Sequence, residues 1–300
     1  MLSAHEKCRT PAHNRHTSGI LKGWTETLEM PGFDTHKFIF LCGLHRSGTS
    51  PLFRTLRDHP QISGFRDTGV PEDEGQHLQT VYPSARVYGG PGRFGFAAEA
   101  HMTESSPLAS RGTAERLFRE WSSRWDTSCE FLLEKSPPNL IRTRFLQRCF
   151  PNSYFIVIVR HPIAVSLATL KFARLRLAKL LEHWKVCHEL FEADRQFLNH
   201  VLVIRYEDLC TRTSEVLMSI KEAVGLKSAL TAQLETGANE RYFEQWRQFA
   251  QTASGTTVRN DLIPCYERYF QTYGYNLSDP STLSPFDRDA STTARVARSA

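Results

Sequence analysis

Residues 43–50 read Gly-Leu-His-Arg-Ser-Gly-Thr-Ser, between an apolar run, KFIFLCGL (37–44), and a segment with helical spacing of apolar residues, TSPLFRTLRDH (49–59). A continuous apolar run is typical of a strand buried on both faces of a parallel sheet. A glycine-containing turn from such a strand into a helix presents backbone N–H groups to an anion. We therefore predict a phosphate-binding loop at this position, with an ordinary strand–turn–helix connection as the alternative.

The composition of this loop differs from that of a nucleoside-triphosphate loop. The spacing G-x-x-x-x-G-K-S/T is kept, but Thr49 stands at the lysine position. A kinase or GTPase without that lysine lacks the cation that stabilises the β and γ phosphates. Arg46 supplies a positive charge instead, Gly48 permits the turn, and Ser47, Thr49 and Ser50 offer hydroxyl groups. This set favours a single phosphate ester over a triphosphate with magnesium.

The rest of the chain alternates strand-like and helical patterns. The expected strands after the first are FLLEK (131–135), YFIVIVR (154–160) and HVLVIRYEDL (200–209). After the first helix, we expect helices at 139–150 and 214–226, and one or two long helices at 162–198. Residues 82–112, rich in glycine and proline, predict a long irregular loop with a functional role. The alternation predicts a three-layer α/β domain with a central parallel sheet and helices on both faces.

Composition limits the class of protein and its compartment. The net charge of +5 over 300 residues is too small for a nucleic-acid coat, and suits an anionic small ligand. Seven scattered cysteines without a C-x-x-C motif indicate a reducing, cytoplasmic compartment. No signal peptide or transmembrane segment is apparent. We expect a flexible arm at 1–35, one domain at 36–278 and a disordered tail at 279–300.

Two further motifs follow the loop. The segment IVIVRHPIAVSLATLKF (156–172) has an arginine and a proline between a strand and a helix, and VIRYEDL (203–209) ends a strand. With HRSGTS (45–50), these motifs resemble the sulfotransferases that use 3′-phosphoadenosine 5′-phosphosulfate (PAPS), particularly the protein-tyrosine and bacterial branches. The resemblance covers residues 38–225. It implies a P-loop-like fold, PAPS as co-substrate, no metal, and a hydroxyl acceptor that is a small molecule, carbohydrate, lipid or peptide.

The resemblance also implies donor-binding residues. The loop, with Arg46, Ser47, Gly48, Thr49 and Ser50, would bind the 5′-phosphosulfate.

The 3′-phosphate would be bound by Arg160, since a guanidinium can bind a phosphate with two parallel hydrogen bonds. The family usually has a serine eight residues later, where this chain has Ala168. Thr169 is the nearer substitute around the helix and Ser166 the more distant one. Tyr206 resembles the family tyrosine that packs near the adenine.

The resemblance further implies that Lys135 contacts the oxygen that bridges sulfate and phosphate. With Arg46, it would stabilise the charge that develops on the leaving phosphate. Small-molecule sulfotransferases place a catalytic histidine two residues after this lysine, but here that residue is Pro137. The general base must therefore lie elsewhere.

The acidic turn VPEDEGQHLQ (70–79) offers three candidates for the base. Repulsion between crowded carboxylates can raise the pKa of one of them toward a value useful for proton abstraction. We predict Glu72, with Glu74 and His77 as the alternatives.

Two other functions remain open at this point. A P-loop-like nucleotide kinase would need lysine at position 49 and an aspartate after a second strand, for which Asp208 is the near candidate. A non-catalytic nucleotide-binding protein on the same fold is the second alternative, which only an activity assay excludes.

Overall fold

A computed structural model describes residues 33–232 and 237–286 of the chain. At the centre of this part lies a parallel sheet with the strand order β2-β3-β1-β4-β5. The strands are β1 (Lys37–Gly43), β2 (Ile62–Gly64), β3 (Phe131–Lys135), β4 (Ser153–Val159) and β5 (Val201–Arg205). Burial explains why their sequences are mostly apolar, since every residue of β3 and all but the first of β1 are buried. Glu134 and Lys135, at the end of β3, are buried charged exceptions.

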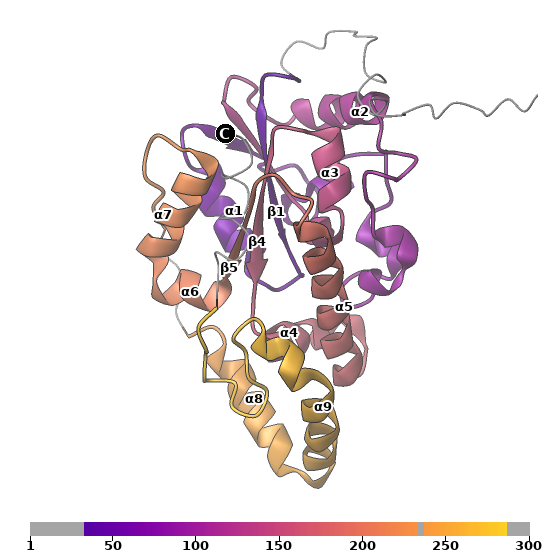
Figure 1. Cartoon of the computed structure of the whole chain (residues 1–300), viewed down its shortest axis with the longest axis vertical. Coiled ribbons are helices and arrows are strands. Elements are labelled where there is room, and N and C mark those ends of the chain that lie inside the picture. The colour runs from indigo at the N-terminus through magenta and orange to yellow at the C-terminus, as the bar shows by residue number, and fades with distance from the viewer. Residues whose placement is uncertain (1–32, 233–236, 287–300) are drawn as a thin grey trace, which may run out of the picture.

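Helices cover both faces of the sheet, so the domain has three layers (Figure 1). α1, α6 and α7 lie on one side, α2, α3 and α5 on the other, and α8 and α9 extend beyond the end of the sheet where β4 leads into α4 (Figure 1). The predicted α/β fold is confirmed. The helix bounds are α1 (Thr49–Arg57), α2 (Arg111–Ser122), α3 (Thr143–Cys149), α4 (Pro162–Ala173), α5 (Leu177–Arg195), α6 (Tyr206–Thr211), α7 (Thr213–Val224), α8 (Glu240–Gln251) and α9 (Ala253–Gln271).

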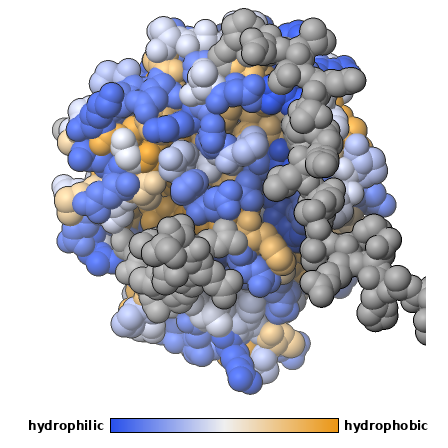
Figure 2. Space-filling model, turned by 45° about the horizontal axis from the view of Figure 1, so that its top comes forward, coloured by the Kyte–Doolittle hydropathy of each residue, from blue (hydrophilic) through white to orange (hydrophobic). Residues whose placement is uncertain are grey.

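The surface has the opposite character to the sheet. The face in Figure 2 is mostly hydrophilic, and hydrophobic side chains occur on it in smaller groups. No helix in the two described ranges is long and apolar enough to cross a membrane.

The segment 162–198, expected to form one or two long helices, forms two, which are separated where Arg174 adopts φ 47°. Two other predicted segments differ locally from the structure. The motif after β5 is helical, because the strand ends at Arg205 and Tyr206 begins α6. The first turns of the expected helix 139–150 form a 3₁₀ helix, because two prolines begin it.

The long connection after α1 contains short helices in place of an irregular loop. They are the 3₁₀ helices η1 (Pro71–Asp73), η2 (Gly75–His77), η3 (Ala85–Tyr88), η4 (Phe94–Phe96) and η5 (Ala98–Ala100). The α-helix α2 then starts inside the predicted loop, with the Ser110 side chain accepting a hydrogen bond from the Thr113 amide.

Most of the two expected terminal segments falls outside the described residues, at 1–32 and 287–300. Cys8 lies there too. Within the described part, Phe286 stacks on Tyr273 with 5.8 Å between ring centroids. The domain boundaries stay predictions.

Candidate active site

The predicted phosphate loop connects β1 to α1, and two close contacts require its glycines. A Cβ atom on Gly43 would lie 2.6 Å from the Ile158 carbonyl oxygen of the neighbouring strand. A Cβ atom on Gly48 would lie 2.4 Å from the Tyr206 ring, and Gly48 also has φ 94°. Any larger side chain at either position would displace the loop from β4 or α6.

A cavity of about 250 Å³ opens over this loop. Its walls bring together the loop, the acidic turn, the end of β4 and the start of α6. The lining residues are His45, Arg46, Gly48, Thr49, Ser50, Pro51, Glu72, Glu74, Pro137, Arg160 and Tyr206. Three predicted site residues are not among them: Ser47, Lys135 and Thr169.

Ser47 belongs to the loop but does not line this cavity. Its side chain is fully buried, and within the described ranges its hydroxyl has no hydrogen-bond partner. Its amide is engaged by the Leu44 oxygen. The first N–H groups of α1 have no partner inside the helix, and no side chain caps them. The loop thus holds both a buried hydroxyl and helix-terminal amides that an anion could engage.

His45 separates this cavity from a smaller one, because it lines both. Burial, with smaller contributions from Lys135, His77 and Arg46, lowers the pKa of His45 to about 3. The imidazole is therefore neutral at physiological pH, and it adds no charge to the loop.

Arg160 contributes a buried positive charge to the cavity. Its guanidinium donates hydrogen bonds to the Arg46 oxygen (2.8 Å), to Asn239 Oδ1 (2.8 Å) and to the Ala238 oxygen (3.2 Å). It also lies over the Tyr206 ring, 4.3 Å from the centroid. All three hydrogen-bond acceptors are neutral, and no carboxylate of the described residues lies within 4 Å of it. Burial lowers the pKa of Arg160, as expected for a cation without a close counter-ion.

The Arg160 contacts reveal a positioning residue that the sequence analysis missed. Asn239, at the start of α8, accepts from Arg160 and donates to Glu207 Oε1 at 2.6 Å. Glu207 also accepts from the His161 amide and the Tyr275 hydroxyl. Glu207 therefore anchors the chain around Arg160. The only local sign of this role in the sequence is that Asn239 directly precedes a segment with a helical pattern.

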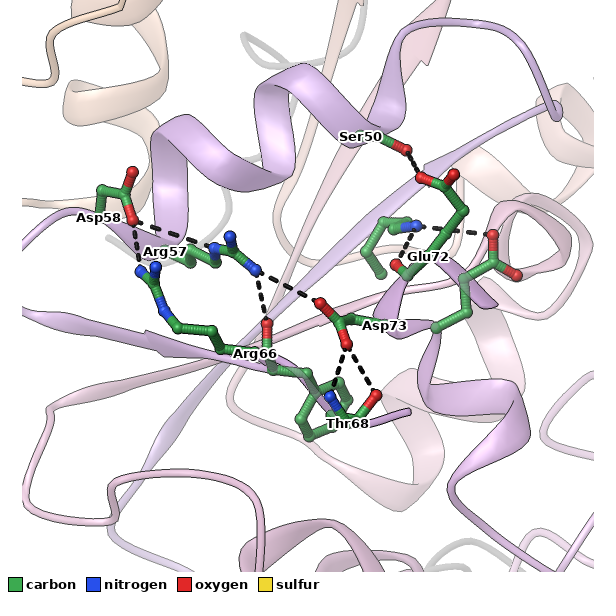
Figure 3. A network of polar contacts seen from close by, with 10 residues as sticks. Ser50, Arg57, Asp58, Arg66, Thr68, Glu72 and Asp73 are labelled. Carbon is green, nitrogen blue, oxygen red and sulfur yellow. Dashed lines mark hydrogen bonds and ion pairs between the residues drawn. The ribbon is translucent and has the colours of Figure 1, made fainter. Parts of the chain in front are cut away.

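The acidic turn lies beside the loop, and its three carboxylates differ in their surroundings (Figure 3). Asp73 is held by Arg57 at 3.4 Å and by the Thr68 amide and hydroxyl at 2.9 and 2.7 Å. Glu72 is exposed, and its Oε2 accepts a hydrogen bond from the Ser50 hydroxyl at 2.8 Å. Asp73 thus fixes the turn, while Glu72 faces solvent at the edge of the loop.

The third carboxylate, Glu74, is buried against Lys135. The lysine Nζ lies 3.5 Å from Glu74 Oε1 and donates to the Glu72 main-chain oxygen at 2.7 Å. Burial raises the pKa of Glu74, and Lys135 opposes that rise. His77 Nε2 lies 3.8 Å from Glu74 Oε2, and burial lowers the pKa of His77. Lys135 is fully buried, beneath the turn rather than in the cavity wall.

Thr169 does not line the cavity that the phosphate loop and Arg160 share. It lines the smaller cavity, of about 10 Å³, together with Ser166. The Ser166 hydroxyl is buried and has no partner among the described residues. Neither hydroxyl lines the cavity that Arg160 lines, so the structure does not bring Thr169 together with the other predicted donor-binding residues.

Within 33–232 and 237–286, no group of three or more His, Cys, Asp or Glu residues is arranged to hold a metal ion.

Comparison with known proteins defines the family. The profile of the sulfotransferase family matches residues 39–229, more than half of the chain, and the protein belongs to this family. No curated protein sequence matches the chain.

Solved structures of sulfotransferases are similar to this chain at low identity. Sulfotransferase STF9 from Mycobacterium avium is 14% identical, with 80% of this chain and 77% of that chain covered and a TM-score of 0.48. STF1 from Mycobacterium tuberculosis is 15% identical, with 70% and 71% covered and a TM-score of 0.43. The sulfotransferase domain of the Synechococcus olefin synthase is 18% identical, with 68% and 76% covered and a TM-score of 0.41.

Proposed function

We propose that this protein transfers a sulfuryl group from PAPS to a hydroxyl acceptor. The observation that carries the proposal is Arg160: a buried guanidinium, without a carboxylate partner in the described residues, lines the same cavity as the phosphate loop. A buried charge without a counter-ion is unfavourable, and an anionic ligand would relieve that cost. A donor with phosphates at both the 5′ and 3′ positions would engage the loop and Arg160 together.

Each part of the site has a role in this proposal. The loop amides, with Arg46, Ser47, Gly48, Thr49 and Ser50, bind the 5′-phosphosulfate. Arg160 binds the 3′-phosphate, and the Tyr206 ring beside it packs near the adenine. A contribution from Thr169 stays a prediction, since it lies in the smaller cavity.

The transfer step follows from the same groups. The acceptor oxygen forms a bond to sulfur, and the bond from sulfur to the oxygen of the 5′-phosphate breaks, leaving its electron pair on that oxygen. The acceptor proton moves to the Glu72 carboxylate, which lies at the cavity and is exposed. The products are a sulfate ester and adenosine 3′,5′-bisphosphate.

Lys135 stabilises the charge on the leaving phosphate from beneath the turn. Direct contact with the bridging oxygen requires the acidic turn to rearrange, because Lys135 is fully buried and does not line the cavity. Glu74, with an oxygen 3.5 Å from the amine, helps to orient the lysine side chain.

A kinase function has no support from the comparisons. Thr49, at the position of the P-loop lysine, is buried and cannot supply a cation.

A cytoplasmic location stays a prediction, supported by the free thiols of Cys42, Cys149 and Cys187 in the core.

The proposal is tested by incubating the protein with PAPS labelled in its sulfur and a panel of phenols, alcohols, sugars and hydroxylated lipids. We expect label in at least one acceptor, with release of one adenosine 3′,5′-bisphosphate per transfer. An Arg46→Ala variant should lose the transfer, whereas Arg124→Ala, an exposed arginine just after α2, should keep it. A protein that neither binds PAPS nor transfers its label would refute the proposal.

A further inference from the structure

The segment that runs from α4 into α5 carries positively charged side chains and no acidic ones. From Pro162 to Leu181 the sequence contains no Asp or Glu, and it contains four cations within nine residues. All four are exposed: Lys171, Arg174, Arg176 and Lys179. This segment crosses the end of α4, turns at Arg174 and enters α5.

Contacts place this segment at the mouth of the proposed active site. The Phe172 ring is 68% exposed, and the Arg46 guanidinium lies 5.9 Å from its centroid. Arg46 lines the cavity above the phosphate loop. Arg93 donates to the Ala173 oxygen at 2.9 Å, which fixes the end of α4 against the segment 85–100. We call the surface formed by Arg46, Lys171, Phe172, Arg174, Arg176 and Lys179 the basic rim.

Most of the charge of the basic rim is not neutralised locally. Lys179 forms an ion pair with Glu182 at 2.8 Å. Among the residues that the structure describes, no carboxylate lies within ion-pair distance of Arg46, Lys171, Arg174 or Arg176. Clustered cations of this kind raise the local concentration of anions and orient anionic ligands.

We propose that the basic rim binds a negatively charged group of the acceptor, so that the acceptor is a hydroxyl compound bearing a carboxylate, sulfate or phosphate beside an apolar or aromatic part. The apolar part packs on Phe172, and the anionic group lies on Arg174 and Arg176. This inference rests on the proposed function. The donor's phosphates are already assigned to Arg160 and to the loop with Arg46, so the other cations of the rim are left for the second substrate.

The test uses a matched pair of acceptor probes, 3-(4-hydroxyphenyl)propionate and its neutral methyl ester. Their affinities are measured by calorimetry with the full chain saturated with adenosine 3′,5′-bisphosphate. We expect the carboxylate to bind about threefold to tenfold more tightly than the ester, as for a few partly screened surface charges. The preference should shrink as salt is raised from low to high concentration.

Two variants compatible with the local backbone locate the effect. Arg176→Glu places an acid at the N-terminus of α5, where the helix dipole favours it. Arg174→Gly places glycine where φ is 47°. Each should remove the preference for the carboxylate, while Arg124→Glu, a charge reversal at an exposed arginine just after α2, should keep it.

The inference is overturned by equal binding of the two probes, by no detectable binding of the carboxylate, or by variants that keep the preference. It is also overturned if Arg176→Glu weakens bisphosphate binding, because the rim would then belong to the donor site. Failure of the wild-type protein to bind the bisphosphate would instead contradict the proposed function.

Discussion

The guanidinium of Arg160, directly after β4, donates a hydrogen bond to the main-chain oxygen of Arg46 in the phosphate loop at 2.8 Å. The two ligand-binding elements of the proposed donor site are therefore joined before any ligand binds. Arg160 also contacts Asn239, so the same side chain ties the start of α8 to the loop.

Replacing Arg160 tests its proposed role in binding the 3′-phosphate. Arg160→Ala should weaken binding of adenosine 3′,5′-bisphosphate by roughly 10²-fold, because truncating one partner of a buried charge pair costs several kcal/mol. Binding of 5′-AMP, which lacks the 3′-phosphate, should weaken much less. Asn239→Ala is the matched control, since it removes a contact of Arg160 but keeps the charge. Equal losses for both nucleotides in calorimetric titrations would remove Arg160 from this role.

The identity of the general base is tested at the acidic turn. Glu72→Gln should lower turnover by roughly 10²-fold or more at saturating PAPS, with little change in donor affinity. Glu74→Gln and His77→Ala are the comparisons. If Glu72→Gln stays active and one of these loses activity, the base is that residue.

The dependence of turnover on pH further distinguishes Glu72 from Glu74 as the general base. Burial raises the pKa of Glu74 above its usual value. A base must be deprotonated, so a reaction that uses Glu74 would lose turnover as the pH falls through this raised pKa. Because Glu72 is the proposed base, we expect Glu74→Gln to leave the position of the acid limb of kcat unchanged. A displaced limb in this variant would identify Glu74 as the base.

The ion pair of Lys135 and Glu74 provides a test of stability. Lys135→Met leaves a buried carboxylate without its partner and should destabilise the fold by about 3 kcal/mol. The double variant with Glu74→Gln should recover at least half of that loss, because neither charge is then left alone. Urea unfolding of the four proteins measures the coupling. Additive losses would mean that the pair does not act as a unit.

The buried carboxyl group of Glu134 should make the stability of the fold depend on pH. Burial raises the pKa of Glu134 to about 7, although Ser136 and Asn139 donate hydrogen bonds to it. The folded state therefore binds this proton more tightly than the unfolded chain does. Stability from this group is present below about pH 4.5 and is lost as the pH rises to about 7, by about 3 kcal/mol in total. Glu134→Gln should remove that slope when wild type and variant are compared by urea unfolding from pH 5 to pH 8. Parallel curves would contradict it.

The sequence predicted those parts of the structure that local patterns determine. β1 and β4 were recognisable because burial on both faces makes their residues apolar after the first position. The phosphate loop was recognisable because close contacts demand Gly43 and Gly48. β2 was missed because three residues, Ile62–Gly64, are too short for any periodicity to show.

Contacts between distant segments could not be predicted in this way. Asn239 reaches Arg160 across 79 residues, and no spacing in the sequence indicates that pair. The sequence likewise could not rank the carboxylates of the acidic turn. Their difference arises from burial, since Glu74 lies over Lys135 while Glu72 lies at Ser50. The prediction of Thr169 rests on the rotation of an ideal helix, which does not indicate which of the two cavities its side chain lines.

Calorimetric titration of the wild-type protein measures whether the cavity recognises a donor with both a 5′ and a 3′ phosphate. Adenosine 3′,5′-bisphosphate should bind with one site per chain and raise the melting temperature, because the loop and Arg160 each engage one phosphate. ATP with magnesium should bind far more weakly, because Thr49 stands in place of the lysine that a triphosphate needs. Equal affinity for the two nucleotides, or no binding of the bisphosphate, would contradict the account.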